Sequence, residues 1–125
     1  MIEREKMIEV KGSKLRVKFP NVGQLIDMES LKVAISSGRY GQMALSGIKS
    51  MTVALDFIDA MVFFSILCPQ VKNLYGVKEL TSLDPSEGKE LVEIYLRDIR
   101  PWYSKIESEL YASGSTESKN AEQAD

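Results

Sequence analysis

The sequence predicts an α+β fold that is mainly α, with an N-terminal β-hairpin packed on a small bundle of about four helices. Two observations carry this prediction: a short segment of alternating polarity near the N-terminus, and longer stretches with the period of an α-helix after it. At 125 residues the chain is long enough for one hydrophobic core. We therefore expect a single domain over residues 1–111, followed by a tail.

The hairpin is expected over residues 7–19, where apolar and polar side chains alternate around a Gly12-Ser13 pair that is typical of a tight turn. Its apolar face has to pack on the helices, because an isolated hairpin is only marginally stable in water. With Gly12-Ser13 as the turn, the register places Val10 opposite Leu15 and Ile8 opposite Val17.

The other face of the hairpin carries a basic row, Lys14, Arg16 and Lys18. We interpret this row as a solvated face that discourages edge-to-edge aggregation. The alternative is a docking strip for an acidic partner or for nucleic acid. Nucleic acid is the less expected partner, because the chain outside its last 14 residues carries no net charge and lacks a broad positive field.

The first helix is expected to begin after Pro20 and to run to about Ser36. Asn21 and Gln24 have the spacing of a capping box, in which each side chain accepts a hydrogen bond from the backbone of the other residue. A compact loop with glycine at both ends, residues 38–41, should follow the helix.

A long central helix is expected from about Gln42 to just before Pro69, with Gly47 as a weak point. Its segment from Met51 to Cys68 is apolar almost all round, so this surface has to be covered by the chain itself, by a second copy or by another protein. The polar side chains of the helix form one narrow stripe: Lys49, Thr52, Asp56 and Asp59.

Asp56 and Asp59 lie one helical turn apart and resemble a catalytic carboxylate pair. No further acidic ligands or cleft signature accompany them, so we interpret them as side chains that keep one face of the helix in water. They also limit the longest uncharged run to Ala60–Cys68, about half of the length that a bilayer requires. We expect no membrane span.

A C-terminal helix is expected to begin at Asp84, an N-cap followed by Pro85 at the first helical position and Glu87 as a capping-box residue. Pro101 should kink or split it near Arg100, because proline removes a backbone donor. The apolar stripe of this helix comprises Leu91, Tyr95, Ile99, Trp102, Ile106 and Leu110.

Composition argues against an enzyme. The chain has no histidine and a single cysteine, Cys68, so histidine-based catalysis, structural zinc sites and internal disulfides are unavailable to it. Cys68 is expected to be a small buried hydrophobe. No glycine-rich phosphate loop is present, and we expect no cofactor and no metal. The charged N-terminus has no apolar signal region, so we expect a cytoplasmic protein.

Residues 112–125 account for the whole formal charge of −2. They combine Ser, Ala and Gly with three acidic residues and one lysine, a composition that buries little apolar area. We expect a disordered acidic tail.

These observations favour a protein-binding adaptor with more apolar helix surface than a small body covers. We expect a protein partner, and a homo-oligomer is a second way to cover the surface. The expected partner-binding residues lie on the central helix and at the proline bend: Phe57, Met61, Phe64, Tyr95, Trp102 and Tyr103.

The order of elements resembles a known family. The hairpin from Ile8 to Phe19, the segment Pro20-Asn21-Val22-Gly23-Gln24-Leu25-Ile26-Asp27 and the helical remainder are similar to the tail assembly chaperones of tailed bacteriophages. The resemblance spans roughly residues 8–110. It implies a protein of the host cytoplasm that coats the tape-measure protein during tail morphogenesis, recruits tail-tube subunits and is absent from the finished virion.

Two alternatives stay open. A structural virion component, such as a head-completion or tail-terminator ring subunit, would bury the same helices between identical copies. A small nucleic-acid-binding regulator would use the basic side chains of the hairpin and of the following loop, Lys14, Arg16, Lys18 and Arg39.

Overall fold

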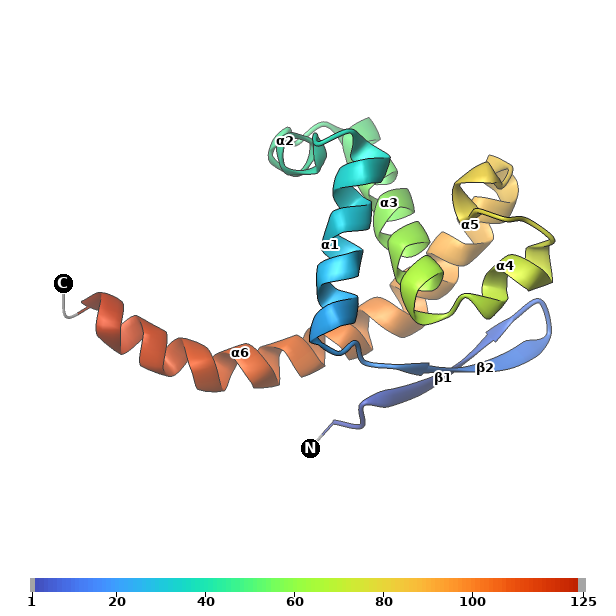
Figure 1. Ribbon diagram of the computed structural model, residues 1–125. Helices are drawn as coiled ribbons and strands as arrows, with labels where there is room; N and C mark the ends of the chain where they lie inside the picture. The colour runs from blue at the N-terminus through green and yellow to red at the C-terminus, as the bar shows by residue number, and fades with distance from the viewer. Residues whose placement is uncertain (1, 124–125) are drawn as a thin grey trace.

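The computed structural model describes the backbone of residues 2–123 and the side chains up to Ala112. A two-stranded antiparallel hairpin lies beneath a group of helices, as the sequence predicted, so the fold class is confirmed (Figure 1). Helices α1 and α3 lie side by side, and α6 extends away from the body. The elements are β1 (Glu5–Val10), β2 (Ser13–Lys18), α1 (Val22–Ser36), α2 (Tyr40–Leu45), α3 (Lys49–Leu67), α4 (Gln70–Tyr75), η1 (Leu80–Ser82), α5 (Pro85–Ile94), η2 (Tyr95–Ile99) and α6 (Arg100–Gln123).

The hairpin turn lies one residue earlier than predicted. Lys11 and Gly12 both have positive φ, 51° and 78°, and form the two-residue turn in place of Gly12-Ser13. Such a turn matches the right-handed twist of the strands. Val10 is therefore opposite Ser13 and Ile8 is opposite Leu15, so the predicted register is wrong by two.

A register shift of two leaves every side chain on its predicted face. Ile8, Val10 and Val17 are buried against the helices. The basic row is exposed on the other face, where Glu5 makes only long ion pairs of 3.7 Å to Arg16 and 3.9 Å to Lys18.

Helix α1 begins as predicted. The Asn21 side chain accepts from the Gln24 N–H at 2.8 Å, and the Gln24 side chain accepts from the Asn21 N–H at 3.0 Å. The helix ends at Ser36, after which Ser37 and Gly38 both adopt left-handed conformations. The loop is shorter than the expected residues 38–41, because the next helix already begins at Tyr40.

The expected central helix is two helices. Gly47, with φ of 69°, separates α2 from α3, so the weak point is a complete break. Left-handed backbone cannot continue a right-handed helix, and glycine adopts it at little cost. The chain thereby turns sharply between the short α2 and the long α3.

The C-terminal half of α3 forms the centre of the hydrophobic core. Its residues from Ala60 to Phe64 are all buried, and Phe63 and Phe64 contact each other edge to face with ring centroids 5.6 Å apart. Helices α1, α2 and α5 pack around α3. By length and composition α3 also qualifies as a membrane-spanning helix, a test that core helices of soluble proteins pass as well.

The expected connector after α3 contains the short helices α4 and η1. Helix α5 then begins with Asp84 as N-cap and Pro85 at its first position, as predicted. The Asp84 carboxylate accepts from the Ser86 N–H at 3.0 Å and from the Ser86 hydroxyl group, whereas the expected capping role of Glu87 is not seen.

The effect of Pro101 is a π-helical turn, η2, directly before α6. The Arg100 N–H donates to the carbonyl of Tyr95, five residues earlier. This turn links α5 and α6 into one bent helical path. The backbone of α6 continues as helix to Gln123, and the expected disorder of residues 112–125 stays a prediction. The side chains beyond Ala112 and residues 124–125 lie outside the described part.

The aromatic residues near the bend fasten the hairpin to α6. The Trp102 indole N–H donates to the carbonyl of Glu3 at 2.8 Å. The Phe19 ring, just after β2, lies 6.2 Å from the Trp102 ring and 4.8 Å from the Tyr103 ring. These contacts join segments that are far apart in sequence, which explains how so small a hairpin stays ordered.

Phe64→Ala should reduce the free energy of unfolding by about 3–5 kcal/mol, because Phe64 is fully buried and its loss leaves a cavity. Urea unfolding followed by circular dichroism would measure the change. The matched control is Leu45→Ala, at a position 88% exposed, which should cost about 0.5 kcal/mol or less. Similar effects of the two substitutions would show that Phe64 is not a core residue.

Cys68 is completely buried, and burial raises the pKa of its thiol to about 11. The reactive thiolate is therefore scarce in the folded protein. Iodoacetamide at about pH 8 should alkylate native Cys68 far more slowly than the unfolded chain in concentrated urea. Mass spectrometry over time would compare the two rates, and equal rates would contradict the burial.

Candidate functional site

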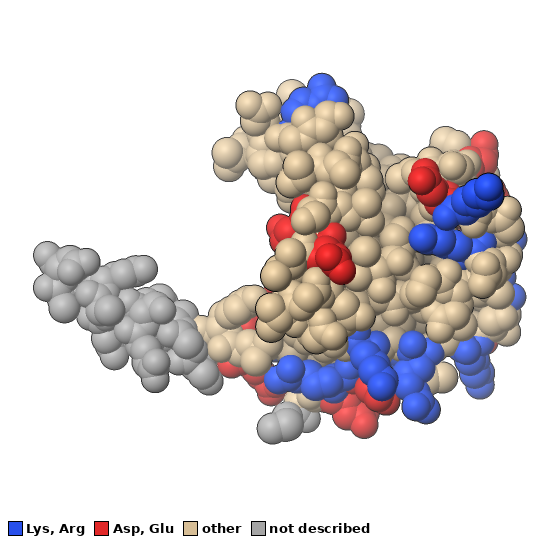
Figure 2. Space-filling view, in the orientation of Figure 1, with Lys and Arg blue, Asp and Glu red and all other residues tan. Residues whose placement is uncertain are grey.

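A cleft of about 400 Å³ lies between α1, α3 and α6. It opens on the concave side of the molecule, between the lobe that carries α2 and the extended α6 (Figure 2). Its lining combines four tyrosines with charged residues of both signs: Tyr40, Tyr95, Tyr103 and Tyr111, with Glu29, Lys32, Asp59, Arg100 and Glu107. This volume is in the range of ligand pockets, which span about 300–1,000 Å³.

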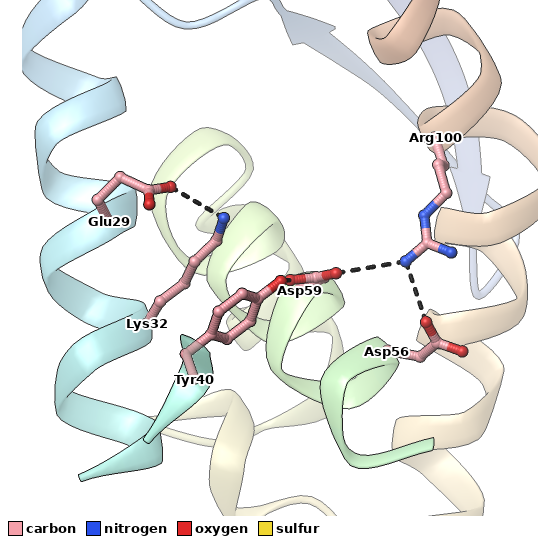
Figure 3. Close-up of polar contacts among 6 residues, drawn as sticks. All are labelled: Glu29, Lys32, Tyr40, Asp56, Asp59 and Arg100. Atoms are coloured by element: carbon pink, nitrogen blue, oxygen red, sulfur yellow. Dashed lines mark hydrogen bonds and ion pairs between the residues drawn. The ribbon is translucent and has the colours of Figure 1, made fainter. Parts of the chain in front are cut away.

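A cluster of hydrogen bonds and ion pairs forms the floor of the cleft (Figure 3). The Tyr40 hydroxyl donates to the Asp59 carboxylate at 2.6 Å. Arg100 lies between two carboxylates, 3.0 Å from Asp56 and 3.3 Å from Asp59. Three helices, α2, α3 and α6, are thereby joined through one set of side chains.

This cluster corrects the interpretation of Asp56 and Asp59 as a wet helix face. Both side chains are more than three-quarters covered, with exposed fractions of 24% and 17%. Each carboxylate is engaged by Arg100, which reaches it from α6. A cation between them removes the like-charge repulsion that a catalytic pair would exploit, so the pair is structural.

Two cations in the cleft are each held by at least one carboxylate and by one aromatic ring. Lys32 lies 2.9 Å from Glu29, and its ammonium lies 5.1 Å from the centre of the Tyr40 ring. The guanidinium of Arg100 lies 5.3 Å from the centre of the Tyr95 ring, beside its two carboxylates. Both arrangements combine an ion pair with a cation–π contact.

Burial and nearby carboxylates keep Tyr40 and Tyr103 neutral in the cleft. Burial, the hydrogen bond to Asp59 and the charge of Asp59 all raise the pKa of Tyr40 well above its usual range. Burial and the charge of Glu107 do the same for the pKa of Tyr103. These phenols therefore act as hydrogen-bond donors and aromatic surfaces, and not as bases.

The structure divides the six expected partner-binding residues into three groups. Met61, Phe64 and Trp102 are buried in the core of the chain itself, so the expectation of exposed surface is wrong for them. Tyr95 and Tyr103 are half-buried and line the cleft. Phe57 is half-buried and, together with Met61, lines a separate apolar groove of about 270 Å³ between α3 and α5.

Part of the exposed apolar surface lies elsewhere, from the end of α2 to the first turns of α3. We call this segment the apex, and Figure 2 shows that the lobe carrying α2 is mostly free of charged side chains. Sequence reasoning missed it because exposed and buried apolar residues look alike there. Its large apolar side chains are Leu45, 88% exposed, Ile48, 54%, Met51, 37%, and Val53, 50%.

Among the residues that the structure describes, no group of three or more His, Cys, Asp or Glu side chains is placed to hold a metal ion. In the described part of the cleft, Glu29 and Asp59 face cations, and burial keeps the Tyr40 and Tyr103 phenols protonated. What the arrangement offers is recognition, through aromatic rings and charges in the cleft and through apolar side chains at the apex.

Tyr40→Phe should reduce the free energy of unfolding by about 1–2 kcal/mol, because it removes the hydroxyl that Asp59 binds. Urea unfolding measures this, and faster hydrogen exchange in α2 would locate it. Tyr111→Phe is the matched control, since Tyr111 is 59% exposed, and should cost about 0.5 kcal/mol or less. Equal costs would mean that the bond does not hold α2.

Comparisons of the chain with protein-family models, with curated proteins and with solved structures found no match, so the functional argument depends on the fold and on these surfaces.

Proposed function

We propose that the protein is a non-enzymatic, protein-binding adaptor, and specifically a tail assembly chaperone of a tailed bacteriophage. It would bind the tape-measure protein in the host cytoplasm while the tail is built. The observation that carries the proposal is the apex, where four large apolar side chains within nine residues are exposed to water.

The exposure of the apex has an energetic meaning. Fully burying a completely exposed aliphatic side chain of this size is favourable by roughly 1.5–3 kcal/mol, so a partner that covers the apex gains the share of this that corresponds to the exposed part of each side chain. Contiguous apolar surface on a small soluble domain commonly marks an interaction site. The partner surface should itself be apolar and elongated, as on one face of a helix.

Met51 in the apex adds adaptability, because methionine side chains adjust to surfaces of different shape. Farther along α3, Phe57 lines the apolar groove, which offers a second place for a client side chain. The hairpin followed by a capped helix agrees with the element order of the chaperone family that the sequence resembles. Together these features support transient binding of a helical client.

Co-expression with the tape-measure protein of the same phage tests the proposal. The wild-type chain should keep the client soluble, and Ile48→Glu should abolish this effect, because a carboxylate at the apex would have to be desolvated on binding. The soluble fraction of the client after centrifugation is the measurement.

Met7→Glu is the matched control, because Met7 is also 54% exposed but lies on the hairpin. It should solubilise the client as well as the wild type does. An insoluble client with wild-type protein would refute the proposal. Mass spectrometry of purified virions separates it from the alternative of a ring subunit, which would be found in the particles.

A further inference from the structure

The cleft contains one carboxylate that lacks a partner. Glu107 lines it from α6, and no hydrogen bond or ion pair to Glu107 forms within residues 2–112. Burial, the largest cause, raises the pKa of Glu107, Lys32 opposes this shift, and Glu29 adds to it. The Glu107 carboxylate is thus partly desolvated, and Lys32, which is paired with Glu29, offsets this only in part.

Glu107 also has aromatic neighbours, as Lys32 and Arg100 do in the same cleft. Tyr103 and Tyr111 lie one helical turn before and after it on α6, and both line the same cleft. The cleft therefore has three positions at which a carboxylate and an aromatic ring lie close together. Lys32 and Arg100 occupy the first two positions, and the third holds no cation from the described residues.

We propose that this third position binds a lysine or arginine side chain of the client, with the cation between the Glu107 carboxylate and the Tyr103 and Tyr111 rings. The proposal rests on the proposed function, since it names the chemistry of the client. Charge complementarity selects a cation, because the existing cations are already paired with Glu29, Asp56 and Asp59.

The position is accessible and the cleft has room for the side chain. Tyr111 is 59% exposed and Glu107 is half-buried, so a side chain can enter from solvent. Because the cleft opens beside the lobe that carries α2, a client helix on that side of the molecule can present a basic residue to it.

Two synthetic helical peptides of about 18 residues provide the probe, a length at which a helix can form. They share one leucine-rich face and differ only at a central position, which is arginine in one and its neutral isostere citrulline in the other. Fluorescence anisotropy measures their affinities. Wild-type protein should bind the arginine peptide roughly fivefold to tenfold more tightly than the citrulline peptide.

Glu107→Gln should abolish this preference for arginine. The variant should be at least as stable as the wild type in thermal unfolding, because the substitution removes a partly desolvated charge. Glu93→Gln, an exposed residue of α5 that does not line the cleft, is the matched control and should keep the preference. Tyr111→Ala should weaken the preference, whereas Tyr111→Phe retains the ring and should keep it.

Equal affinities of wild-type protein for the two peptides would overturn the proposal. So would a full preference in Glu107→Gln, or no binding of either peptide up to about 1 mM. The proposed function is tested separately through Ile48→Glu. If Ile48→Glu no longer keeps the client soluble while the peptides reveal no arginine preference, the adaptor function is supported and only the binding of a basic client residue at Glu107 is rejected.

Discussion

Incomplete coverage of α3 is the constraint on which the rest of the structure depends. Its C-terminal half is enclosed, with every residue from Ala60 to Phe64 buried. Helices α1 and α5 pack against α3, and the buried side chains of the hairpin belong to the same hydrophobic core. Its N-terminal half projects beyond that core, so Met51 and Val53 face water. One helix thus supplies core residues of the domain and part of its exposed apolar surface.

Features that depend on a few adjacent residues could be predicted from the sequence. The capping box of Asn21 and Gln24 and the N-cap at Asp84 are local, because each requires only hydrogen bonds within one turn. The apolar faces of the hairpin were also predictable, since alternation assigns them whichever turn is used. The turn itself was not, because Gly12 fits either of two overlapping pairs of turn residues.

Features that depend on tertiary contacts could not be predicted from one sequence. Nothing near Asp56 or Asp59 indicates that Arg100, more than 40 residues later, reaches both. The same limit applies to the candidate sites. Phe64 and Ile48 are both apolar residues of the expected central helix, yet one is fully buried and the other is half exposed. Burial is a property of the assembled fold, so the local sequence does not distinguish a buried apolar residue from an exposed one.

The π-helical turn before Pro101 accounts for the alignment of the C-terminal stripe. Leu91 and Ile99 are eight residues apart, which on a straight α-helix would rotate them about 80° away from each other. The π turn accommodates one extra residue, so this interval acts like seven and both side chains are fully buried, as is Ile106 seven residues farther on. The irregular spacing therefore matches the π turn: Leu91, Ile99 and Ile106 stay on one side of the bent helix because that turn contains one extra residue.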